Sequence, residues 1–450
     1  MWVESITLTN IKCFREEKIL FTRNQTTGSR AKPYSWITLL GENGVGKSTL
    51  LQALALLLSG PEAAKELLPR PTGWVRDPST PGKLSAVLHK EEIDAGSFGE
   101  DKIRKTFSYS YFVTGGIPVP VGKEKETYTE PALIEESSKI LSWLRTNAFA
   151  SDTQGWFAVG YGAFRRLTRF SQVLIPSLEP AKRSSNFITQ FDEDSALSSF
   201  ERWMVYLDYR IAKDMNDNKA QQMRKVGEAV IERLLPEDAK IAEVTADGLI
   251  QFTVNGQKVP TLSLSDGYRS VIALAGDLIW RLLQAFPDLD DPTQASGVVL
   301  IDELDIHLHP SWQRQIAGWL RDVFPHLQFF VATHSPLVAA GGGEDALTLR
   351  LDIVDAETQV TPIKDISAYD SDYILRSPAF GLESTHSPET QEKITRYHQL
   401  RRKIDDLIGE ERKEYEELRH FMKESQPIGG PPEPGSLEAR TKAFLEANLP

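Results

Sequence analysis

The chain has little cysteine, no excess of positive charge and no long apolar run. The single cysteine, Cys13, cannot form an intrachain disulfide, which is typical of proteins in a reducing cytosol. The formal net charge of −12 argues against a protein coated with nucleic acid through bulk charge. The first residues lack the basic and apolar regions of a signal peptide, and the longest apolar run, which Gln52 interrupts, is far short of the ~20 residues that cross a bilayer. These absences predict a cytoplasmic protein without a membrane partner.

What the chain does contain is the composition of a globular protein. Hydrophobic residues make up 40% of it and charged residues 25%. Because 450 residues exceed one ordinary domain, we expect one large domain with insertions, or two domains.

A glycine-rich loop matches the phosphate-loop pattern G-x-x-x-x-G-K-[ST] at every fixed position. It follows an apolar run, residues 36–40, and precedes another at 50–56, so the context is strand, loop and helix. Backbone N–H groups of such a loop and the helix N-terminus bind phosphate, while Lys47 adds a full charge and Ser48 offers an oxygen to Mg²⁺. The loop consists of Gly41, Glu42, Asn43, Gly44, Val45, Gly46, Lys47, Ser48 and Thr49.

Two further apolar runs end in polar residues. Residues 297–301 lead into Asp302 and Glu303, and residues 329–332 lead through Thr333 to His334. Ligands of parallel α/β sheets bind at the carboxyl ends of the strands. We therefore expect Asp302 to hold Mg²⁺, Glu303 to polarise the attacking water, and His334 to reach the γ-phosphate.

Ser265, Asp266 and Gly267 stand before an apolar helix predicted at residues 271–283. Such a sequence is a common helix N-cap. It is also a possible phosphate site, because a capped helix N-terminus binds anions.

Together these motifs resemble the ATP-binding-cassette (ABC) ATPases. Residues 264–268, Leu-Ser-Asp-Gly-Tyr, look like the signature motif Leu-Ser-Gly-Gly-Gln, with Asp and Tyr in place of Gly and Gln. The resemblance implies ATP and Mg²⁺ as cofactors. It implies that Lys47, Glu303 and His334 are catalytic, that Ser48 and Asp302 bind the metal, and that Ser265, Gly267 and the D-loop residue Asp305 contact nucleotide together with the phosphate loop.

Spacing and further motifs narrow the resemblance. Lys47 and Ser265 are 218 positions apart, more than transporter cassettes use, and residues 6–14 are similar to the first strand and turn of the SMC, Rad50 and RecF group. Residues 161–165, 302–310 and 380–384 resemble the compact "AAA family" ATPases of bacterial anti-phage systems, among them the ATPase subunit of Septu. The resemblance implies a head-to-tail homodimer around ATP and an HNH nuclease on a separate chain.

The fold class expected is α/β, an ABC-ATPase head domain with a mixed sheet flanked by helices, an α-helical insertion and a C-terminal helical extension. The predicted divisions are residues 1–60 with the phosphate loop, a variable insertion at 61–155, a return to the core with a helical subdomain at 156–260, the signature-to-switch part at 261–365, and the C-terminal extension at 366–450.

Individual elements are also predicted. One helix is expected near residues 134–144 and one long charged helix over 388–422, followed by a proline- and glycine-rich linker at 427–435. The segment from Pro388 onward either docks a partner or packs within the chain.

Three features stay open. Arg165, Arg166 and Arg169 are either a solvated face or a DNA contact, and the same holds for residues 401–403. His307 and His309 are interpreted as ordinary loop residues, because no third metal ligand is evident nearby. No glutamine after the strand that ends near Tyr161 matches the catalytic glutamine of the ABC pattern.

The favoured function is an ATP-gated switch that controls a separate nuclease in anti-phage defence. The alternative is an SMC- or RecF-like ATPase of DNA repair or chromosome maintenance, which acts on DNA without a nuclease partner. A third possibility is the nucleotide-binding subunit of an ABC transporter, against which the motif spacing speaks.

Overall fold

The computed structural model describes residues 1–23, 32–91, 94, 105–122, 126–149, 155–163, 182–192, 199–235, 239–245, 248–364 and 366–424. Two compact units make up the chain, Met1–Gly381 and Leu382–Pro450. The first unit contains all of the predicted nucleotide motifs. The boundary between the units differs from the predicted division at residue 366, because a short helix at 371–376 belongs to the first unit.

An antiparallel sheet forms one layer of the first unit, with strand order β10-β7-β6-β1-β2. Buried and half-buried residues alternate along β6, as expected for a strand with one face on a core. The strands of this sheet are β1 (Trp2–Ile11), β2 (Phe14–Leu20), β6 (Gly82–His89), β7 (Thr106–Val113) and β10 (Leu133–Glu135).

A second sheet has the order β11-β15-β16-β5-β17-β18. Its first five strands run parallel and only the edge strand β18 is antiparallel. All residues of β5, β15 and β16 are buried, which is typical of a parallel sheet covered on both faces. The strands are β5 (Trp36–Leu40), β11 (Ala158–Tyr161), β15 (Gly297–Ile301), β16 (Leu327–Ala332), β17 (Leu347–Val354) and β18 (Glu357–Ile363).

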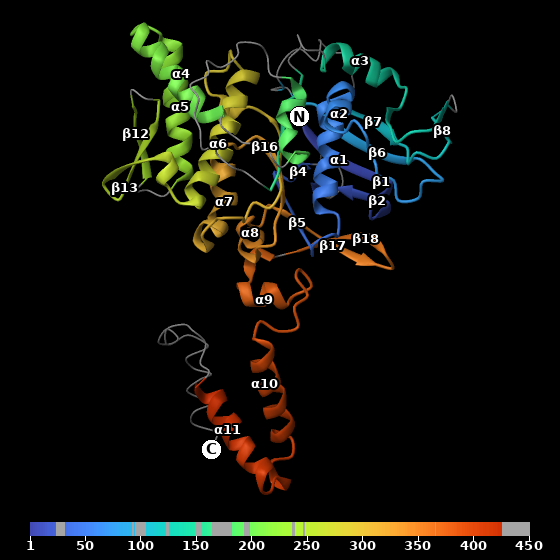
Figure 1. Cartoon of the computed structure of the whole chain (residues 1–450), viewed down its shortest axis with the longest axis vertical. Coiled ribbons are helices and arrows are strands. Elements are labelled where there is room, and N and C mark those ends of the chain that lie inside the picture. The colour runs from blue at the N-terminus through green and yellow to red at the C-terminus, as the bar shows by residue number, and fades with distance from the viewer. Residues whose placement is uncertain are drawn as a thin grey trace. The chain divides into compact units, whose positions relative to one another are not determined.

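Two hydrophobic cores lie on the two faces of this second sheet. Alternate residues of β15 point to opposite faces: Leu300 packs in the core that contains helix α1 (Lys47–Ser59), and Ile301 packs in the core that contains α6 (Asp266–Ala285) and α7 (Pro310–Val323). Helix α1 is buried on nearly all sides because it lies between the two sheets, whereas α6 and α7 cover the other face (Figure 1).

The remaining elements of the first unit are shorter or peripheral. Asn255 and Gly256 both have positive φ between β13 and β14, as a two-residue hairpin turn requires. The elements are β3 (Thr22–Arg23), β4 (Lys32–Pro33), α2 (Pro61–Leu67), β8 (Val119–Val121), β9 (Glu126–Tyr128), α3 (Lys139–Asn147), α4 (Ser199–Lys213), α5 (Asn218–Leu234), β12 (Ala239–Val244), β13 (Ile250–Val254), β14 (Gln257–Pro260), α8 (Pro336–Gly341) and α9 (Ser371–Arg376), with the short 3-10 helices η1 (Arg183–Asn186) and η2 (Ile188–Gln190).

Part of the segment predicted as an insertion belongs to the sheet around β1. Strand β6 pairs with β1 and β7 pairs with β6, so residues 82–89 and 106–113 belong to that layer. The helix predicted near 134–144 begins later, at Lys139, and β10 takes the preceding residues. Ser138 caps α3 by accepting from the N–H of Leu141, which fixes the start of the helix there.

The second unit is a helical hairpin of α10 (Pro388–Arg401) and α11 (Glu410–Glu424). The prediction of one continuous helix over 388–422 is therefore wrong. Gly409 has φ +58 and ends the connection between the two helices, which pack apolar residues against each other inside the hairpin. Its small core consists of Leu400, Leu407 and Tyr415, with Tyr397 and Leu418 packed against it.

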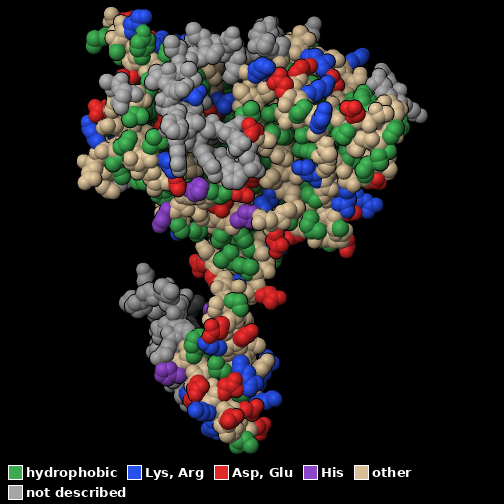
Figure 2. All heavy atoms as spheres, viewed as in Figure 1, with side chains coloured by type: hydrophobic (Ala, Val, Ile, Leu, Met, Phe, Trp, Pro, Cys, Tyr) green, Lys and Arg blue, Asp and Glu red, His purple; other side chains and the backbone are tan. Residues whose placement is uncertain are grey.

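The surface carries charges of both signs. Figure 2 shows lysine, arginine and acidic side chains intermingled on the face that carries α2, α3 and β7. Within the part of the chain that the structure describes, no helix has both the length and the apolar character needed to cross a membrane.

Candidate nucleotide site

Three motif segments meet because the parallel strands end at one edge of the second sheet. Strand β16 pairs with β15 on one side and with β5 on the other. The phosphate loop after β5, Asp302 and Glu303 after β15, and His334 after β16 therefore lie along neighbouring strand ends. The structure thus brings together the residues predicted to bind phosphate and the residues predicted to act on it.

The phosphate loop is held in a conformation that requires glycine. Gly41 and Gly46 have φ +148 and +104. A Cβ atom on Gly41 would lie 2.4 Å from the backbone oxygen of Leu351, and one on Gly46 would lie 2.6 Å from the Cys13 sulfur. The loop is therefore packed from behind by β17 and by the turn after β1, while Gly44 faces open space. This is the cradle that a phosphate group needs.

Lys47 is the cation of the cradle. Its Nζ donates to the backbone oxygens of Gly41 and Glu42, each at 2.8 Å. Burial lowers the pKa of Lys47, and the carboxylates of Asp302, Glu303 and Asp305 act in the opposite direction. These acids are thus close enough to interact with the lysine. Ser48, the next residue, is exposed at the start of α1.

The acidic strand end is strained at its second carboxylate. The backbone N–H of Asp302 donates to Tyr161 O at 2.9 Å, so the end of β15 is tied to the end of β11. Glu303 has φ +46, a left-handed conformation that costs a non-glycine residue of order 1–3 kcal/mol and concentrates at functional sites. In this conformation the chain turns away from β15 at Glu303, and the N–H of the next residue, Leu304, donates to Ala332 O at the end of β16.

Asp305 joins the turn after β15 to the end of β16. Its Oδ1 accepts from the Thr333 hydroxyl and from the backbone N–H of His334 at 3.2 Å. The Thr333 oxygen accepts in turn from the N–H of Ser335. His334 itself is exposed at the sheet edge. The loop that contains Asp305 is therefore hydrogen-bonded directly to the backbone of the residue predicted to sense the γ-phosphate.

Gln313 strengthens this connection, and the motifs gave no indication of it. From α7 its Nε2 donates to Leu308 O at 3.0 Å, while its Oε1 accepts from the Ser335 hydroxyl at 2.6 Å. The only sequence signal is its spacing, one helical turn after His309, the N-cap of α7.

The signature segment lies on the other face of the sheet from α1. Ser265 occupies the N-cap position of α6, but its side chain does not cap the helix and is exposed. Asp266 pairs with Arg269 within the first turn. A Cβ atom on Gly267 would lie 2.8 Å from His307 O, so α6 begins directly against the D-loop. Ser265 therefore belongs to the α6 side, and α1 with Lys47 to the opposite side.

A buried polar network ties α6 to β11. The Tyr161 hydroxyl donates to Asp277 Oδ2 at 3.0 Å, and Arg281 donates to the same oxygen at 2.5 Å and to Asn186 Oδ1 at 2.6 Å. Burial first, and the Asp277 carboxylate second, raise the pKa of Tyr161 well above its usual value. The helix that carries the signature thus contacts the strand next to Asp302 through hydrogen-bonded charges.

The donor set fits a nucleotide with Mg²⁺. Mg²⁺ is usually held by one or two carboxylates together with substrate phosphates. Ser48 and Asp302 supply a hydroxyl and a carboxylate beside the glycine cradle. Among the residues with described placement, no three His, Cys, Asp or Glu side chains gather into a metal site of their own.

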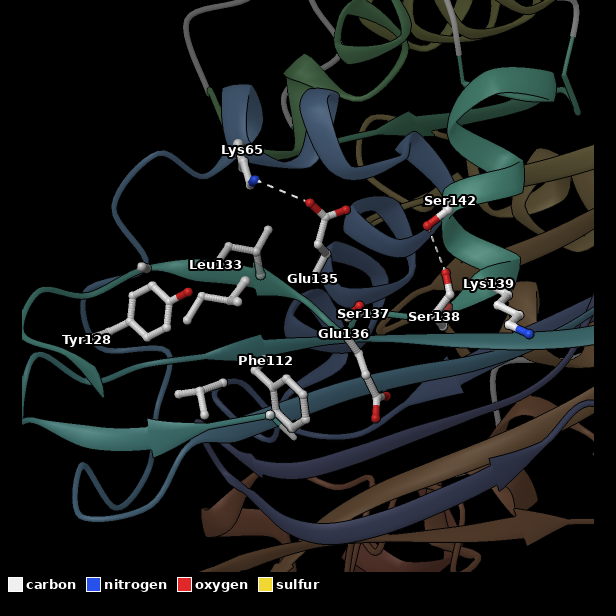
Figure 3. Close-up of a pocket in the computed structure, with 14 residues that line it drawn as sticks. Lys65, Phe112, Tyr128, Leu133, Glu135, Glu136, Ser137, Ser138, Lys139 and Ser142 are labelled. Carbon is white, nitrogen blue, oxygen red and sulfur yellow. Dashed lines mark hydrogen bonds and ion pairs between the residues drawn. The ribbon is translucent and has the colours of Figure 1, made fainter. Parts of the chain in front are cut away.

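A separate cavity of about 970 Å³ lies beside β10, away from the nucleotide motifs. Figure 3 shows Leu133 and Phe112 on its wall and Lys65 directed toward Glu135. Tyr128 lies at the end away from Lys139 and Ser142. Its lining belongs to residues 65–142, whereas the phosphate loop, Asp302 and His334 contribute nothing to it.

Several predicted features fall outside the described residues. These are Arg165, Arg166 and Arg169, and the linker at 427–435. Their proposed roles stay predictions.

Comparison with known proteins identifies relatives. A family model described as "AAA domain, putative AbiEii toxin, Type IV TA system" matches residues 37–340. The Septu protein PtuA of Bacillus mycoides (strain KBAB4) is 27% identical over 401 residues, and PtuA of Bacillus thuringiensis is 24% identical over 376 residues. The alignment with the B. mycoides protein covers 89% of this chain and 47% of the relative, so this chain spans about half of that relative's length. The alignment with the B. thuringiensis protein covers 80% of this chain and 82% of the relative. Among solved structures, an SMC head domain from Thermotoga maritima is similar over 81% of this chain and 100% of its own, at 13% identity and a TM-score of 0.44.

Proposed function

Because the family model covers more than half of the chain, the chain belongs to this AAA-domain family, and from that premise we propose that it is an ATPase. The supporting observation is that the phosphate loop, the acidic pair Asp302-Glu303 and His334 follow the adjacent parallel strands β5, β15 and β16 at one sheet edge. Residues more than 250 positions apart in the sequence thus surround one glycine cradle.

The proposed reaction is hydrolysis of the β–γ phosphoanhydride of ATP. A water oxygen attacks the γ-phosphorus, the bond to the β-phosphate oxygen breaks, and the water proton passes to the Glu303 carboxylate. Lys47 and the loop N–H groups hold the phosphates. Ser48 and Asp302 would hold Mg²⁺, which would supply positive charge that offsets that of the phosphates. His334 at the end of β16 contacts the γ-phosphate.

We further propose that the working unit is a homodimer that closes head-to-tail around ATP. Ser265 and Lys47 lie on opposite sides of the sheet in one chain. A second copy can supply its Ser265 and Gly267 to the nucleotide on the first, and two-fold symmetry then completes both sites. Loss of the γ-phosphate removes the contacts that favour closure.

The similarity to the two Septu proteins PtuA supports a role in anti-phage defence. We propose that in this role the ATPase controls a separate nuclease. The test is whether DNA cleavage by the purified chain with Mg²⁺ requires a second protein. Cleavage by this chain alone would refute the division of labour. We also propose that residues 388–450 dock the partner. If their deletion abolishes the complex with the partner, the C-terminal unit is the docking site, and if the complex is unaffected, docking by this segment is excluded.

The ATPase proposal is tested by Glu303→Gln. The amide keeps the size of the side chain but cannot accept the water proton, so hydrolysis should fall roughly 100-fold or more while ATP binding persists. Phosphate release gives the rate, and light scattering with ATP should show accumulated dimers. The control is Glu389→Gln on exposed α10, which should behave as wild type. Normal turnover in the Glu303 variant would show that another group accepts the proton.

A further inference from the structure

The cavity beside β10 follows the edge of the antiparallel sheet. Residues 132–139 line it without a gap. Because successive side chains of a strand point to opposite faces, a cavity that contacts every residue of β10 follows the edge of the strand and not one face. In Figure 3, Tyr128 lies at one end of the cavity and Lys139 at the other, with Leu133 and Glu135 between them. The cavity is therefore a groove that runs along β10.

The outer edge of β10 carries backbone groups that no strand pairs. The N–H of Glu136 donates to Ser110 O at 3.0 Å, which makes these two residues a bonded pair of the ladder with β7. In an antiparallel ladder the bonded side alternates, so Glu135 and Leu133 direct their N–H and C=O groups away from β7. Within the described residues these groups have no hydrogen-bond partner, because β10 is the last strand of its sheet. Such an edge is a template for another strand.

The end of the groove at α3 is electropositive. Both carboxylates of the lining already have a partner. Glu135 pairs with Lys65 at 3.9 Å. Glu136 pairs with Lys83 at 3.1 Å. Lys139 is exposed, and no acidic side chain of the described residues pairs with it. Since the first turn of α3 also holds no acidic residue, this end of the groove attracts a negative charge.

A second copy of this chain does not fit the groove through the same strand. β10 lies recessed in the cavity, between the β8–β9 hairpin and the start of α3 (Figure 3). Two recessed strands cannot approach to the ~4.8 Å at which neighbouring strands pair. The occupant is therefore a slender segment, and the charge of the groove favours one that carries an acidic residue.

We propose that the groove binds an extended, acidic peptide segment of a partner protein, which pairs with β10 and adds a strand to the five-stranded sheet. An apolar side chain of the segment packs on Tyr128 and Leu133 at the hairpin end of the groove. An acidic side chain about five positions along the segment reaches Lys139 at the other end. In this mode of recognition the main-chain hydrogen bonds give affinity and the side chains give specificity. The site takes part in neither nucleotide binding nor hydrolysis.

The first test is selection of a phage-displayed library of random peptides on the full chain. Selected peptides should carry an acidic residue about five positions from an apolar one. Fluorescein-labelled synthetic copies should bind the full chain in solution, as measured by anisotropy. Lys139→Glu should weaken this binding roughly tenfold, because an attraction becomes a repulsion. The matched control is Lys213→Glu at the end of α4, an equal change of charge at an exposed lysine, which should leave the affinity unchanged.

The second test changes only the peptide, so the folding of the protein plays no part in it. Single backbone nitrogens of the best peptide are methylated in turn. In a paired strand alternate N–H groups face β10, so methylation should abolish binding at every second position and have little effect at the positions between.

Three results would overturn the proposal. The first is a library that yields no binding peptide, and the second is a set of methylation effects without the alternation. The third is a sedimentation coefficient of the chain alone that falls in Lys139→Glu, because a second copy would then occupy the groove.

Discussion

At the scale of single residues, Arg183 closes the C-terminal end of α1 from a distant part of the chain. Its guanidinium group donates to Leu58 O, Ser59 O, Ala148 O and Trp156 O at 3.2–3.3 Å. It also lies against the rings of Phe149 and Trp156. Burial lowers the pKa of Arg183 to about 10. One cation thus satisfies the last carbonyls of the helix that begins with Lys47.

We predict that Arg183→Met destabilises the protein. The change leaves several buried carbonyl oxygens unpaired, so the free energy of unfolding should fall by roughly 2–4 kcal/mol. Urea denaturation followed by fluorescence measures it. The neighbouring Lys182→Met, at an exposed ion pair with Glu66, should cost well under about 1 kcal/mol. Equal effects of the two changes would show that Arg183 is not the cap of α1.

The sequence predicted those site residues that short motifs define, and missed those that only tertiary structure brings in. The phosphate loop, Asp302, Glu303 and His334 stand directly after apolar runs, so their common edge could be foreseen. Their roles in catalysis and binding stay predictions. Gln313 contacts Ser335 at the end of β16 from α7, and a lone glutamine carries no pattern. The pairing of Asp277 with Tyr161 joins positions 116 apart and has no local signal.

At the scale of elements, periodicity predicted the helices and strands better than their ends. The helical subdomain predicted within residues 156–260 contains α4 and α5, whereas the helix predicted near 134–144 begins only at Lys139. Residues 388–422 were wrongly predicted as one helix because the two helices of a hairpin present their apolar residues to each other. In the sequence, this spacing is similar to that of one continuous apolar face. The glycine at 409 was the available signal for the break.

We predict that the chain truncated after Gly381 keeps its fold. The hairpin of α10 and α11 has its own small core, and the two buried cores around α1 and α6 lie wholly in residues 1–381. Residues 1–381 should therefore melt within a few degrees of the full chain and bind ATP with the same affinity. Calorimetry and an ATP-binding titration check this. Aggregation or loss of ATP binding in residues 1–381 would show that the first unit depends on the second.

At the scale of the whole molecule, the predicted P-loop ATPase fold of ABC type is confirmed. The two faces of the parallel sheet determine which site residues one copy of the chain can bring together. Lys47 begins a helix on one face, and Ser265 begins a helix on the other. The proposed dimer follows from this separation. The sequence indicated a dimer only through the resemblance to ABC ATPases, because the face of the sheet on which a helix packs is known only from the folded chain.

We predict that two inactive variants restore activity when mixed. Lys47→Ala removes the phosphate-loop cation and Ser265→Arg blocks the signature. In a head-to-tail dimer one of the two sites of a mixed pair is intact, so random mixing should restore about a quarter of wild-type hydrolysis. Each variant alone, at the same total concentration, is the control. Absence of any recovery, with mixed dimers demonstrated by pull-down of differently tagged chains, would exclude a shared site.

The division of the chain at Gly381 also bears on its history. The polypeptide passes only once from the first unit to the second, and each unit has its own core. A recombination event at this junction therefore exchanges the hairpin in a single crossover and leaves every strand pairing around the phosphate loop untouched. Such an exchange would keep the first unit and replace the C-terminal hairpin. A chimera joined at Gly381 would reproduce it in the laboratory.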